Sequence, residues 1–154
     1  MKLYLLRHGK AARLELDKPR SLTSKGEAEV GLVAEYFKKN KLQVDTLWHS
    51  PKTRALETAR IFQATTGFPR LKMEEKKELK PEGDFLGIFR EINAYPGGSL
   101  MLVTHLPFVG DLAGLLAADS PGAQIAFPTA GLAAFERKGN NWKWLWSLDP
   151  ESLA

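Results

Sequence analysis

The chain has 154 residues, which is the size of one domain and leaves little for a second. Its hydrophobic fraction of 44% and charged fraction of 26% are ordinary for a globular protein, so they exclude a disordered or collagen-like chain. The 22 lysine and arginine residues outnumber the 18 aspartate and glutamate residues, which gives a formal net charge of +4. This excess predicts an anionic partner and leaves its identity open.

The sequence contains no cysteine, which excludes disulfides, thiolate metal sites and a thiol nucleophile. The N-terminal apolar run at residues 3–6 is too short for a signal peptide, and no stretch approaches the roughly 18 apolar residues of a membrane span. We therefore expect a cytoplasmic protein without a membrane partner.

The first half of the chain alternates predicted strands with predicted helices. Residues 3–6 form a short apolar run, which is typical of a strand buried on both faces. A helix is predicted from Ser24, the first residue of a Ser-x-x-Glu capping box. A second strand is predicted at 45–48, followed by a helix that has Ser50 as its N-cap and ends near Gly67.

The second half continues this alternation and closes with a hairpin. The expected elements are a weak strand at 71–76, a loop at 78–84, a short helix at 85–92, a strand at 100–103, a helix at 106–118 and hairpin strands at 132–136 and 142–148. Alternating strands and helices predict an α/β layer fold with a mainly parallel sheet.

Basic and imidazole side chains follow three of the predicted strands. Ligands of open α/β sheets bind at the carboxyl ends of the strands, so these residues are the candidates for a site. Arg7 and His8 follow the first strand, Arg54 begins the helix after the second, and His105 follows the fourth. A helix N-terminus disfavours a cation by up to about 1 kcal/mol, so Arg54 either extends into solvent or shares an anion with the helix. Together with Arg20, these arginines suit a phosphoryl group.

A phosphate site of this kind needs a nucleophile if it belongs to an enzyme, and histidine is able to serve. Neighbouring cations lower the pKa of an imidazole, so His8 would be neutral at pH 7 and keep a lone pair for attack on phosphorus. Gly9 would let the backbone turn sharply beneath the phosphate. His105 would donate to the phosphoryl oxygens, an effect that lowers a barrier by about 2.7–4 kcal/mol elsewhere.

Four short blocks of residues form a series along the chain. The blocks are Leu5-Leu6-Arg7-His8-Gly9, Arg20-Ser21-Leu22-Thr23 with Gly26, Ser50-Pro51 with Arg54-Ala55 and Thr58, and Thr104-His105-Leu106-Pro107 with Val109-Gly110. This series resembles the histidine phosphatase superfamily, also called phosphoglycerate mutase-like. The short chain, the loop at 78–84 and the His-Leu-Pro sequence at 105–107 are most similar to the SixA-type phosphohistidine phosphatases.

The resemblance implies a fold, a mechanism and a set of site residues. It implies a three-layer α/β/α sandwich and a single histidine phosphatase domain over residues 1–154, with no metal and no cofactor. The implied site has His8 as the phosphorylated nucleophile, Arg7, Arg20 and Arg54 as ligands of the phosphoryl oxygens, Gly9 in the phosphate-binding loop and His105 completing the pocket. Water then hydrolyses the phosphohistidine intermediate.

Two departures from the family pattern bear on the substrate. Ser21 stands where the SixA pattern usually has proline. Larger members supply an acidic proton donor from an insertion that this chain lacks, so Glu78 is the candidate donor, with Glu82 and Asp84 as further candidates and a solvated loop acid as the alternative for all three. Because an imidazole leaves more easily than an alkoxide, the missing acid favours a P–N substrate over a phosphate monoester.

The sequence thus predicts a phosphohistidine phosphatase that acts on a phosphocarrier, a histidine kinase domain or a small phosphorylated substrate. One alternative is a phosphomonoesterase with the same pocket, and another is a non-catalytic phosphoprotein-binding domain. A third is a nucleic-acid-binding module built on Trp142, Trp144 and Trp146, which alternate and are expected to share one face of a strand. We expect that face to pack instead, with no nucleic-acid partner.

Overall fold

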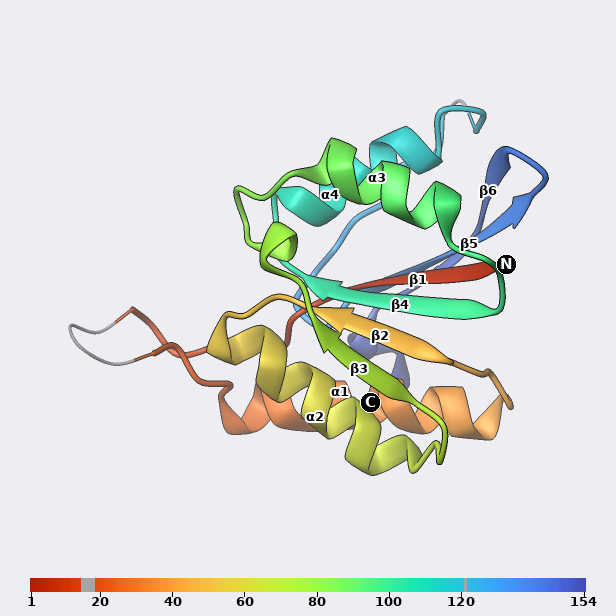
Figure 1. Ribbon diagram of the computed structural model, residues 1–154. Helices are drawn as coiled ribbons and strands as arrows, with labels where there is room; N and C mark the ends of the chain where they lie inside the picture. Colours follow the sequence, from red (N-terminus) through yellow and green to blue (C-terminus); the bar gives the residue numbers. More distant parts are fainter. Residues whose placement is uncertain (15–18, 121) are drawn as a thin grey trace.

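Strands and helices alternate along the computed structural model, which describes residues 1–14, 19–120 and 122–154 (Figure 1). Its elements are β1 (Lys2–Arg7), α1 (Ser24–Lys39), β2 (Thr46–His49), α2 (Thr53–Thr66), β3 (Lys72–Glu75), α3 (Phe85–Ala94), β4 (Ser99–Thr104), α4 (Phe108–Leu116), β5 (Leu132–Lys138) and β6 (Asn141–Leu148). Single 3₁₀ turns lie at Lys77–Leu79 and Pro150–Leu153. The predicted order of elements is confirmed, including the weak strand and the hairpin.

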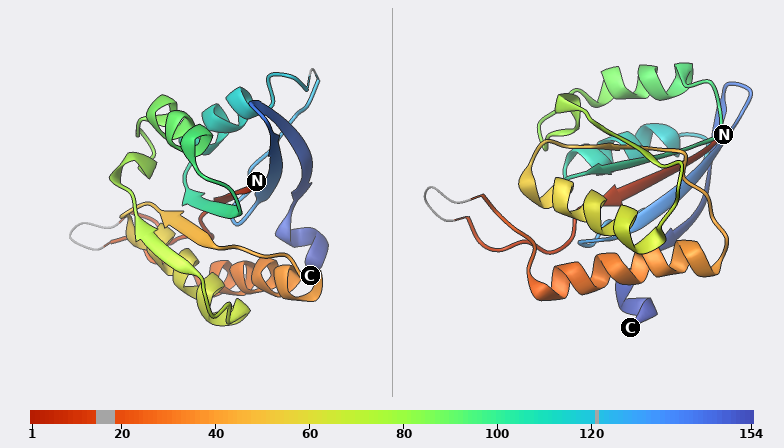
Figure 2. Two further views of the ribbon diagram at one scale, coloured as in Figure 1. Left: turned by 45° about the vertical axis from the view of Figure 1, so that its right-hand side comes forward. Right: turned by 60° about the horizontal axis from the view of Figure 1, so that its bottom comes forward.

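The six strands form one sheet in the order β3-β2-β4-β1-β5-β6. The strands β1 to β4 pair in parallel, whereas β5 and β6 are antiparallel to their neighbours. Helices α1 and α2 cover one face of the sheet, and α3 and α4 cover the other (Figures 1 and 2). The predicted three-layer α/β/α sandwich with a mainly parallel sheet is therefore confirmed.

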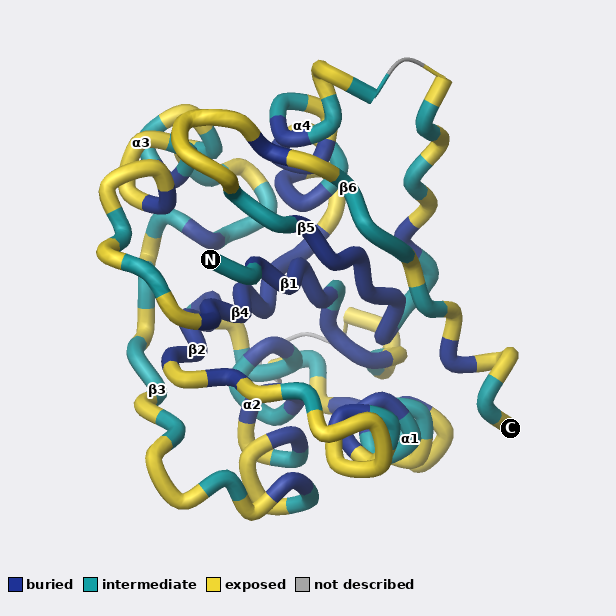
Figure 3. Tube along the Cα trace, turned by 90° about the vertical axis from the view of Figure 1, so that its right-hand side faces the viewer, coloured by how far each residue is buried: buried dark blue, intermediate teal, exposed yellow. Residues whose placement is uncertain are grey.

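The central strands are buried on both faces, as a parallel sheet between two helical layers requires. Alternate side chains of β1 enter different cores: Leu3 and Leu5 pack on the α3–α4 side, whereas Tyr4 and Leu6 pack on the α1–α2 side. Figure 3 shows the same burial as the dark central stretches of β1 and β4. This double burial fixes the positions of the carboxyl ends of the two strands.

The starts of two helices differ from the sequence-based expectation. The N-cap of α1 is Thr23, whose extended backbone lets its hydroxyl oxygen accept a hydrogen bond from the N–H of Gly26 at 3.0 Å. The predicted capping box that starts at Ser24 is therefore wrong by one residue. Helix α2 begins at Thr53, so Ser50 lies before the helix and is free for a different contact.

The tryptophans of β6 do not share one face, so that prediction is wrong. A β-bulge in β6 places Trp144 opposite one residue of β5 and Trp146 opposite the preceding one, with Leu145 inserted between them. Trp142 and Trp144 pack against the α3–α4 core, whereas Trp146 packs on the other side against Tyr4. The continuous aromatic platform expected of the nucleic-acid-binding alternative is not formed.

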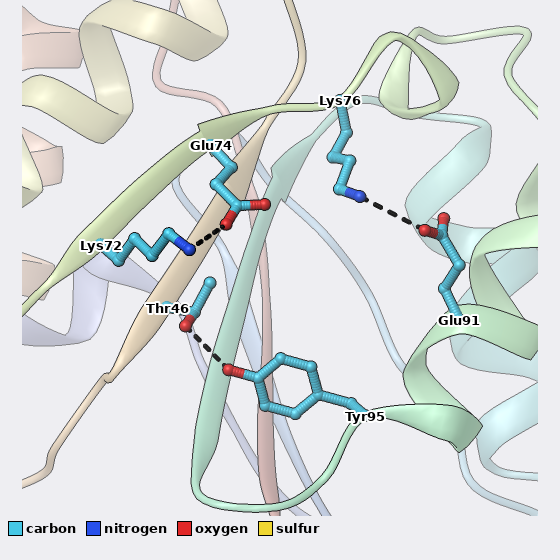
Figure 4. A network of polar contacts seen from close by, with 6 residues as sticks. All are labelled: Thr46, Lys72, Glu74, Lys76, Glu91 and Tyr95. Carbon is cyan, nitrogen blue, oxygen red and sulfur yellow. Dashed lines mark hydrogen bonds and ion pairs between the residues drawn. The ribbon is translucent and has the colours of Figure 1, made fainter.

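Polar contacts connect α3 and its C-terminal cap to β2 and to the residue that follows β3 (Figure 4). The hydroxyl of Tyr95, at the end of α3, donates to Oγ1 of Thr46 at 2.7 Å. The ammonium group of Lys76 lies 3.3 Å from a carboxylate oxygen of Glu91 and 4.5 Å from the ring centroid of Trp48. The Lys76 contacts lie at the start of the 77–84 segment, and the hydroxyl of Thr104 at the end of β4 donates to the carbonyl oxygen of Leu79 within it. None of the helices in the described ranges has the length and apolar character needed to cross a bilayer.

The first turn of α1 packs against the segment that follows β1. A Cβ added to Gly26 would overlap the carbonyl oxygen of Lys10, whereas one added to Gly31 of the same helix would meet nothing within 4 Å. We expect Gly26→Ala to lower the free energy of unfolding by about 1–3 kcal/mol. Gly31→Ala is expected to raise it by about 0.5–1 kcal/mol, because alanine favours the helix. Urea unfolding measures both, and equal stability of the two variants would contradict this packing.

Candidate active site

Two histidines meet where β1 and β4 end. The strands are parallel neighbours with Arg7 opposite Thr104, so the next residues, His8 and His105, lie side by side. Their ring centroids are 5.0 Å apart, and their exposed fractions are 6% and 1%. The parallel register therefore brings together two side chains that are 97 positions apart in the chain.

The hydrogen bond of the His8 ring fixes its tautomer. Its Nδ1 lies 2.7 Å from the carbonyl oxygen of Gly9, which only accepts, so the ring proton is on Nδ1 and Nε2 keeps its lone pair. The pKa of His8 is lowered to about 4, first by burial and then by the charges of Arg54, Arg7 and Arg20, whereas the bond to Gly9 opposes this shift. The imidazole is neutral at pH 7, and burial is the largest single cause, ahead of each of the arginines that the sequence pointed to.

His105 is held by a serine to which sequence analysis had given a different role. Its Nε2 lies 2.8 Å from Oγ of Ser50, and the same Oγ accepts the N–H of Lys52 at 3.2 Å. The buried Nδ1 of His105 has no hydrogen-bond partner in the described part of the chain. Burial, followed by the neighbouring charge of His8, lowers the pKa of His105 to about 3. The sequence signal that could have identified Ser50 as a site residue is its position in the third block of the family pattern, which also contains Arg54.

Two arginines direct unpaired donors into the same region. Arg7 is held by a bond from Nη1 to the carbonyl oxygen of Phe127 at 2.9 Å. The Nε atoms of Arg7 and Arg54 are buried, and neither has a hydrogen-bond partner among the residues described. Burial lowers the pKa of each guanidinium, and the charge of Arg20 lowers both further. Buried cationic donors without partners form a site that favours an anion.

Arg20 reaches this cluster from the loop between β1 and α1. Its Nε donates to the carbonyl oxygen of Ala12 at 2.9 Å, which holds the side chain against its own loop. The charge of Arg20 lowers the pKa values of Arg7, Arg54 and His8, so all of the predicted cations lie near one another. The structure thus places every predicted basic group at one edge of the sheet.

Gly9 makes a close contact that sequence analysis did not predict. Its N–H donates to Oγ1 of Thr58 at 3.0 Å, and that hydroxyl donates in turn to the carbonyl oxygen of Arg54 at 2.7 Å. The backbone of Gly9 is not left-handed, but a Cβ there would lie 2.9 Å from Cγ2 of Val30. Glycine is needed here for close packing and no left-handed turn is formed, whereas the place of Gly9 in the phosphate-binding loop stays a prediction. Thr58, to which sequence analysis had assigned no role, connects the loop after β1 to α2.

The three candidate proton donors lie in different surroundings. The carboxylate of Asp84 caps α3 by accepting the N–H of Gly87 at 2.9 Å, so it has a structural role. Glu78 lies in the 3₁₀ turn that follows β3, and its carboxylate makes no hydrogen bond or ion pair with the residues that the structure describes. The charge of Glu82 raises the pKa of Arg54 and thus acts on the pocket directly. Glu82 is thus the acid whose charge reaches a pocket arginine, and the proton-donor role of Glu78 stays a prediction.

A pocket of about 290 Å³ opens beside the arginines. It is lined by Leu14, Pro19, Arg20, Pro51, Lys52, Thr53 and Arg54. The site therefore has a buried part, around the histidines and the guanidinium Nε atoms, and an open part with both apolar and cationic walls.

Comparison with known proteins identifies this arrangement. Residues 3–98 match the family model of the histidine phosphatase superfamily (branch 1), which is more than half of the chain. The chain belongs to the histidine phosphatase superfamily. The matched residues include His8, Arg7, Arg20 and Arg54, whereas His105 lies beyond them. The inclusion of His105 in the site of this histidine phosphatase therefore rests on the geometry at the end of β4 and on the overall similarity described next.

Individual relatives of this histidine phosphatase resemble it over most of their length. It is 34% identical to an uncharacterised protein of Picosynechococcus, over 86% of this chain and 82% of the relative. It is 29% identical to the phosphohistidine phosphatase SixA of Escherichia coli, over 99% of this chain and 96% of the relative. The structure of the protein histidine phosphatase SixA complexed with tungstate covers 100% of both chains with a TM-score of 0.90 and 28% identity.

The neutral histidines make the stability of this histidine phosphatase depend on pH. The pKa of His8 in the folded state, about 4, lies below its ordinary value of 6.5, so the unfolded chain binds a proton first as the pH falls. The stabilisation is complete above about pH 6.5 and is lost as the pH falls toward 4. Between pH 7 and pH 5, we expect the wild type to lose about 2 kcal/mol more than the His8→Asn variant. Urea unfolding at both pH values measures this, and parallel losses would contradict it.

Proposed function

We propose that the chain is a phosphohistidine phosphatase that uses His8 as its nucleophile. The observation that carries this proposal is a neutral imidazole, with its lone pair on Nε2, beside buried guanidinium donors that have no partner in the described residues. The similarity to SixA proteins in sequence and structure supports phosphohistidine as the substrate class. The proposed unit is one histidine phosphatase domain over residues 1–154, and a cysteine-free chain is compatible with the cytoplasm.

In the first step, Nε2 of His8 attacks the phosphorus of the substrate. A new N–P bond forms as the P–N bond of the substrate breaks, and the departing imidazole keeps the electron pair and takes a proton from solvent. Arg7, Arg54 and Arg20 bind the phosphoryl oxygens, whose charge they match with charge-assisted hydrogen bonds. No separate acid is needed, because an imidazole leaves with little activation. The charge of Glu82 acts on Arg54, so Glu82 is available to orient that arginine.

In the second step, water attacks the phosphorus of phosphorylated His8. The N–P bond breaks, Nε2 recovers its lone pair, and inorganic phosphate leaves with the oxygen of the water. The hydrogen bond from Nδ1 to Gly9 persists through both steps, so the ring keeps its orientation. This pocket lowers the barrier in two ways: it orients the nucleophile, and it supplies fixed hydrogen-bond donors.

Ser50 has a positioning role in this scheme. Its oxygen accepts the N–H of Lys52, and in the arrangement we propose its own proton is donated to Nε2 of His105, so that the ring proton of His105 is on the unpartnered Nδ1. We expect Ser50→Ala to lower kcat about tenfold to a hundredfold with little change in KM, and Ser50→Thr to restore most of it. Nitrogen NMR of His105 reports the tautomer. An unchanged tautomer and an unchanged kcat in Ser50→Ala would contradict this role.

The proposed function is tested by assaying one phosphohistidine-bearing phosphocarrier protein beside a panel of phosphate monoesters. We expect release of phosphate from the phosphocarrier at a kcat/KM at least about a hundred times that of any monoester, because alkoxide leaving groups require an acid. Faster hydrolysis of a monoester would instead assign the pocket to a phosphomonoesterase. Binding of the phosphocarrier without turnover would assign it to a phosphoprotein-binding domain.

A further inference from the structure

A carboxylate of α2 bonds to the segment between β1 and α1 that carries Arg20, here called the Arg20 segment (residues 10–14 and 19–23). The backbone N–H of Leu22 donates to Oε1 of Glu57 at 3.0 Å. Leu22 lies two positions after Arg20 in the chain. Glu57 lies three positions after Arg54, so their side chains are neighbours on the surface of α2. The bond therefore attaches the segment of one predicted phosphate ligand one helical turn away from another.

A short ladder within the Arg20 segment directs the N–H of Leu22 outward. Residues 10–12 and 21–23 lie antiparallel, with Ala11 opposite Leu22. The two ladder hydrogen bonds, of 2.8 and 2.9 Å, lie on either side of this pair. Leu22 thus belongs to a non-hydrogen-bonded pair, in which the backbone N–H groups point out of the ladder. Glu57 supplies the acceptor that this outward N–H needs.

Leu22 is also where the Arg20 segment packs against the rest of the protein. Its side chain is 7% exposed and packs with Val30 of α1. A Cβ added to Gly9 would lie 3.3 Å from Cδ2 of Leu22, so Leu22 is next to the loop that follows β1. In contrast, residues 12–14 and Pro19 are exposed, and Figure 1 shows these parts of the segment extending away from the sheet. Leu22 therefore anchors a segment that has few other supports among its described residues.

The position of Arg20 depends on this anchor. Its Nε donates to the carbonyl oxygen of Ala12 at 2.9 Å, so the guanidinium is held by the ladder itself. From there its charge lowers the pKa values of Arg7, Arg54 and His8. A shift of the ladder would carry this charge away from the site.

We infer that Glu57 is a positioning residue, which holds Arg20 in place to bind the phosphoryl group through its bond to Leu22. This inference rests on the proposed function, because it assigns a role within the same site. The acid whose charge acts on Arg54 is Glu82, so the part played by Glu57 is that of a hydrogen-bond acceptor. The amide oxygen of glutamine also accepts a hydrogen bond, whereas alanine has no acceptor in its side chain.

The test is a double-mutant cycle between Glu57→Ala and Arg20→Ala. We measure kcat/KM for a phosphohistidine-bearing phosphocarrier, and the Kd of inorganic phosphate by titration calorimetry. Glu57→Ala is expected to lower kcat/KM about tenfold to a hundredfold and to weaken phosphate binding, as Arg20→Ala does. In the Arg20→Ala background, Glu57→Ala should change both quantities by less than about twofold, because Arg20 is already absent.

Glu57→Gln separates the hydrogen bond from the charge, and it should restore both quantities to within about threefold of the wild type. The control is Glu35→Ala, which removes an exposed carboxylate of α1 and should leave both unchanged. Circular dichroism verifies the fold of each variant.

Three results would overturn the positioning role of Glu57. They are wild-type behaviour of Glu57→Ala, losses that multiply in the double variant, and a Glu57→Gln variant as impaired as Glu57→Ala. A wild type that hydrolyses no phosphohistidine would instead overturn the proposed function. In that case the phosphate affinities alone would still decide whether Glu57 acts through Arg20, so the two failures are distinguishable.

Discussion

His8→Ala is expected to lower kcat/KM for phosphohistidine by at least about a thousandfold while the protein stays folded. The substitution removes the only lone pair that the scheme uses to attack phosphorus, and no cysteine is present to replace it. The ring of His8 is neutral at pH 7 and its Nδ1–H bonds to the carbonyl oxygen of Gly9, so the loss of the ring leaves no buried charge unpaired. Steady-state hydrolysis and circular dichroism together measure the effect.

The chain offers a matched control for this variant. His49 is also buried, with 5% of its surface exposed, and its Nδ1 lies 3.0 Å from the carbonyl oxygen of Ser50. It ends β2 as His8 follows β1, but it has no assigned part in the chemistry. His49→Ala should lower stability as any buried truncation does, yet keep kcat/KM within about tenfold. A His8→Ala enzyme that keeps more than a tenth of its activity would contradict the assignment of the nucleophile.

Arg54→Ala is expected to lower kcat/KM about a hundredfold to a thousandfold without lowering the free energy of unfolding. The guanidinium is partly buried near Arg7 and Arg20, its Nε has no partner among the described residues, and its pKa is lowered by burial and by Arg20. In the free protein this charge is therefore unfavourable, and its removal relieves repulsion. Arg54→Lys should recover only part of the rate, because an ammonium lacks the fork that matches phosphoryl oxygens.

The control for Arg54 lies on the same helix. Arg60 is an exposed residue of α2, so Arg60→Ala makes the same change of charge away from the pocket. Its kcat/KM should match that of the wild type. A marked loss of stability in Arg54→Ala, or equal rates in the two variants, would argue against a phosphate-binding role for Arg54.

The sheet and the meeting of the basic groups were predictable from sequence, because continuous apolar runs identify strands buried on both faces. Arg7, His8 and His105 directly end such runs, so a parallel register was enough to place them together. The helix starts were less accessible, because Thr23 and Ser24 are both good caps and only the backbone conformation selects between them. The β-bulge in β6 was likewise not predictable, because nothing in the alternating tryptophans marks its position.

The residue roles that sequence analysis missed in the site are those that depend on contacts between distant segments. Ser50 looked like a helix cap because it precedes proline, but its hydroxyl bonds to His105, which arrives from another strand. Thr58 reads as an ordinary helical residue, yet it joins Gly9 to the backbone of Arg54. In the sequence, Gly9 is compatible with a turn. In the structure, glycine is required at this position because Val30 of α1 packs against it. Pairings of this kind depend on tertiary structure.

Trapping the phosphorylated enzyme tests the central claim most directly. The protein is mixed with a phosphohistidine-bearing phosphocarrier, quenched in alkali, where phosphohistidine survives, and analysed by mass spectrometry of its peptides. We predict one phosphoryl group on His8 of the wild type, none on His49 or His105, and none in the His8→Ala variant. Rapid turnover of the phosphocarrier with no phosphoryl group on His8, or with the phosphoryl group on another residue, would contradict the account.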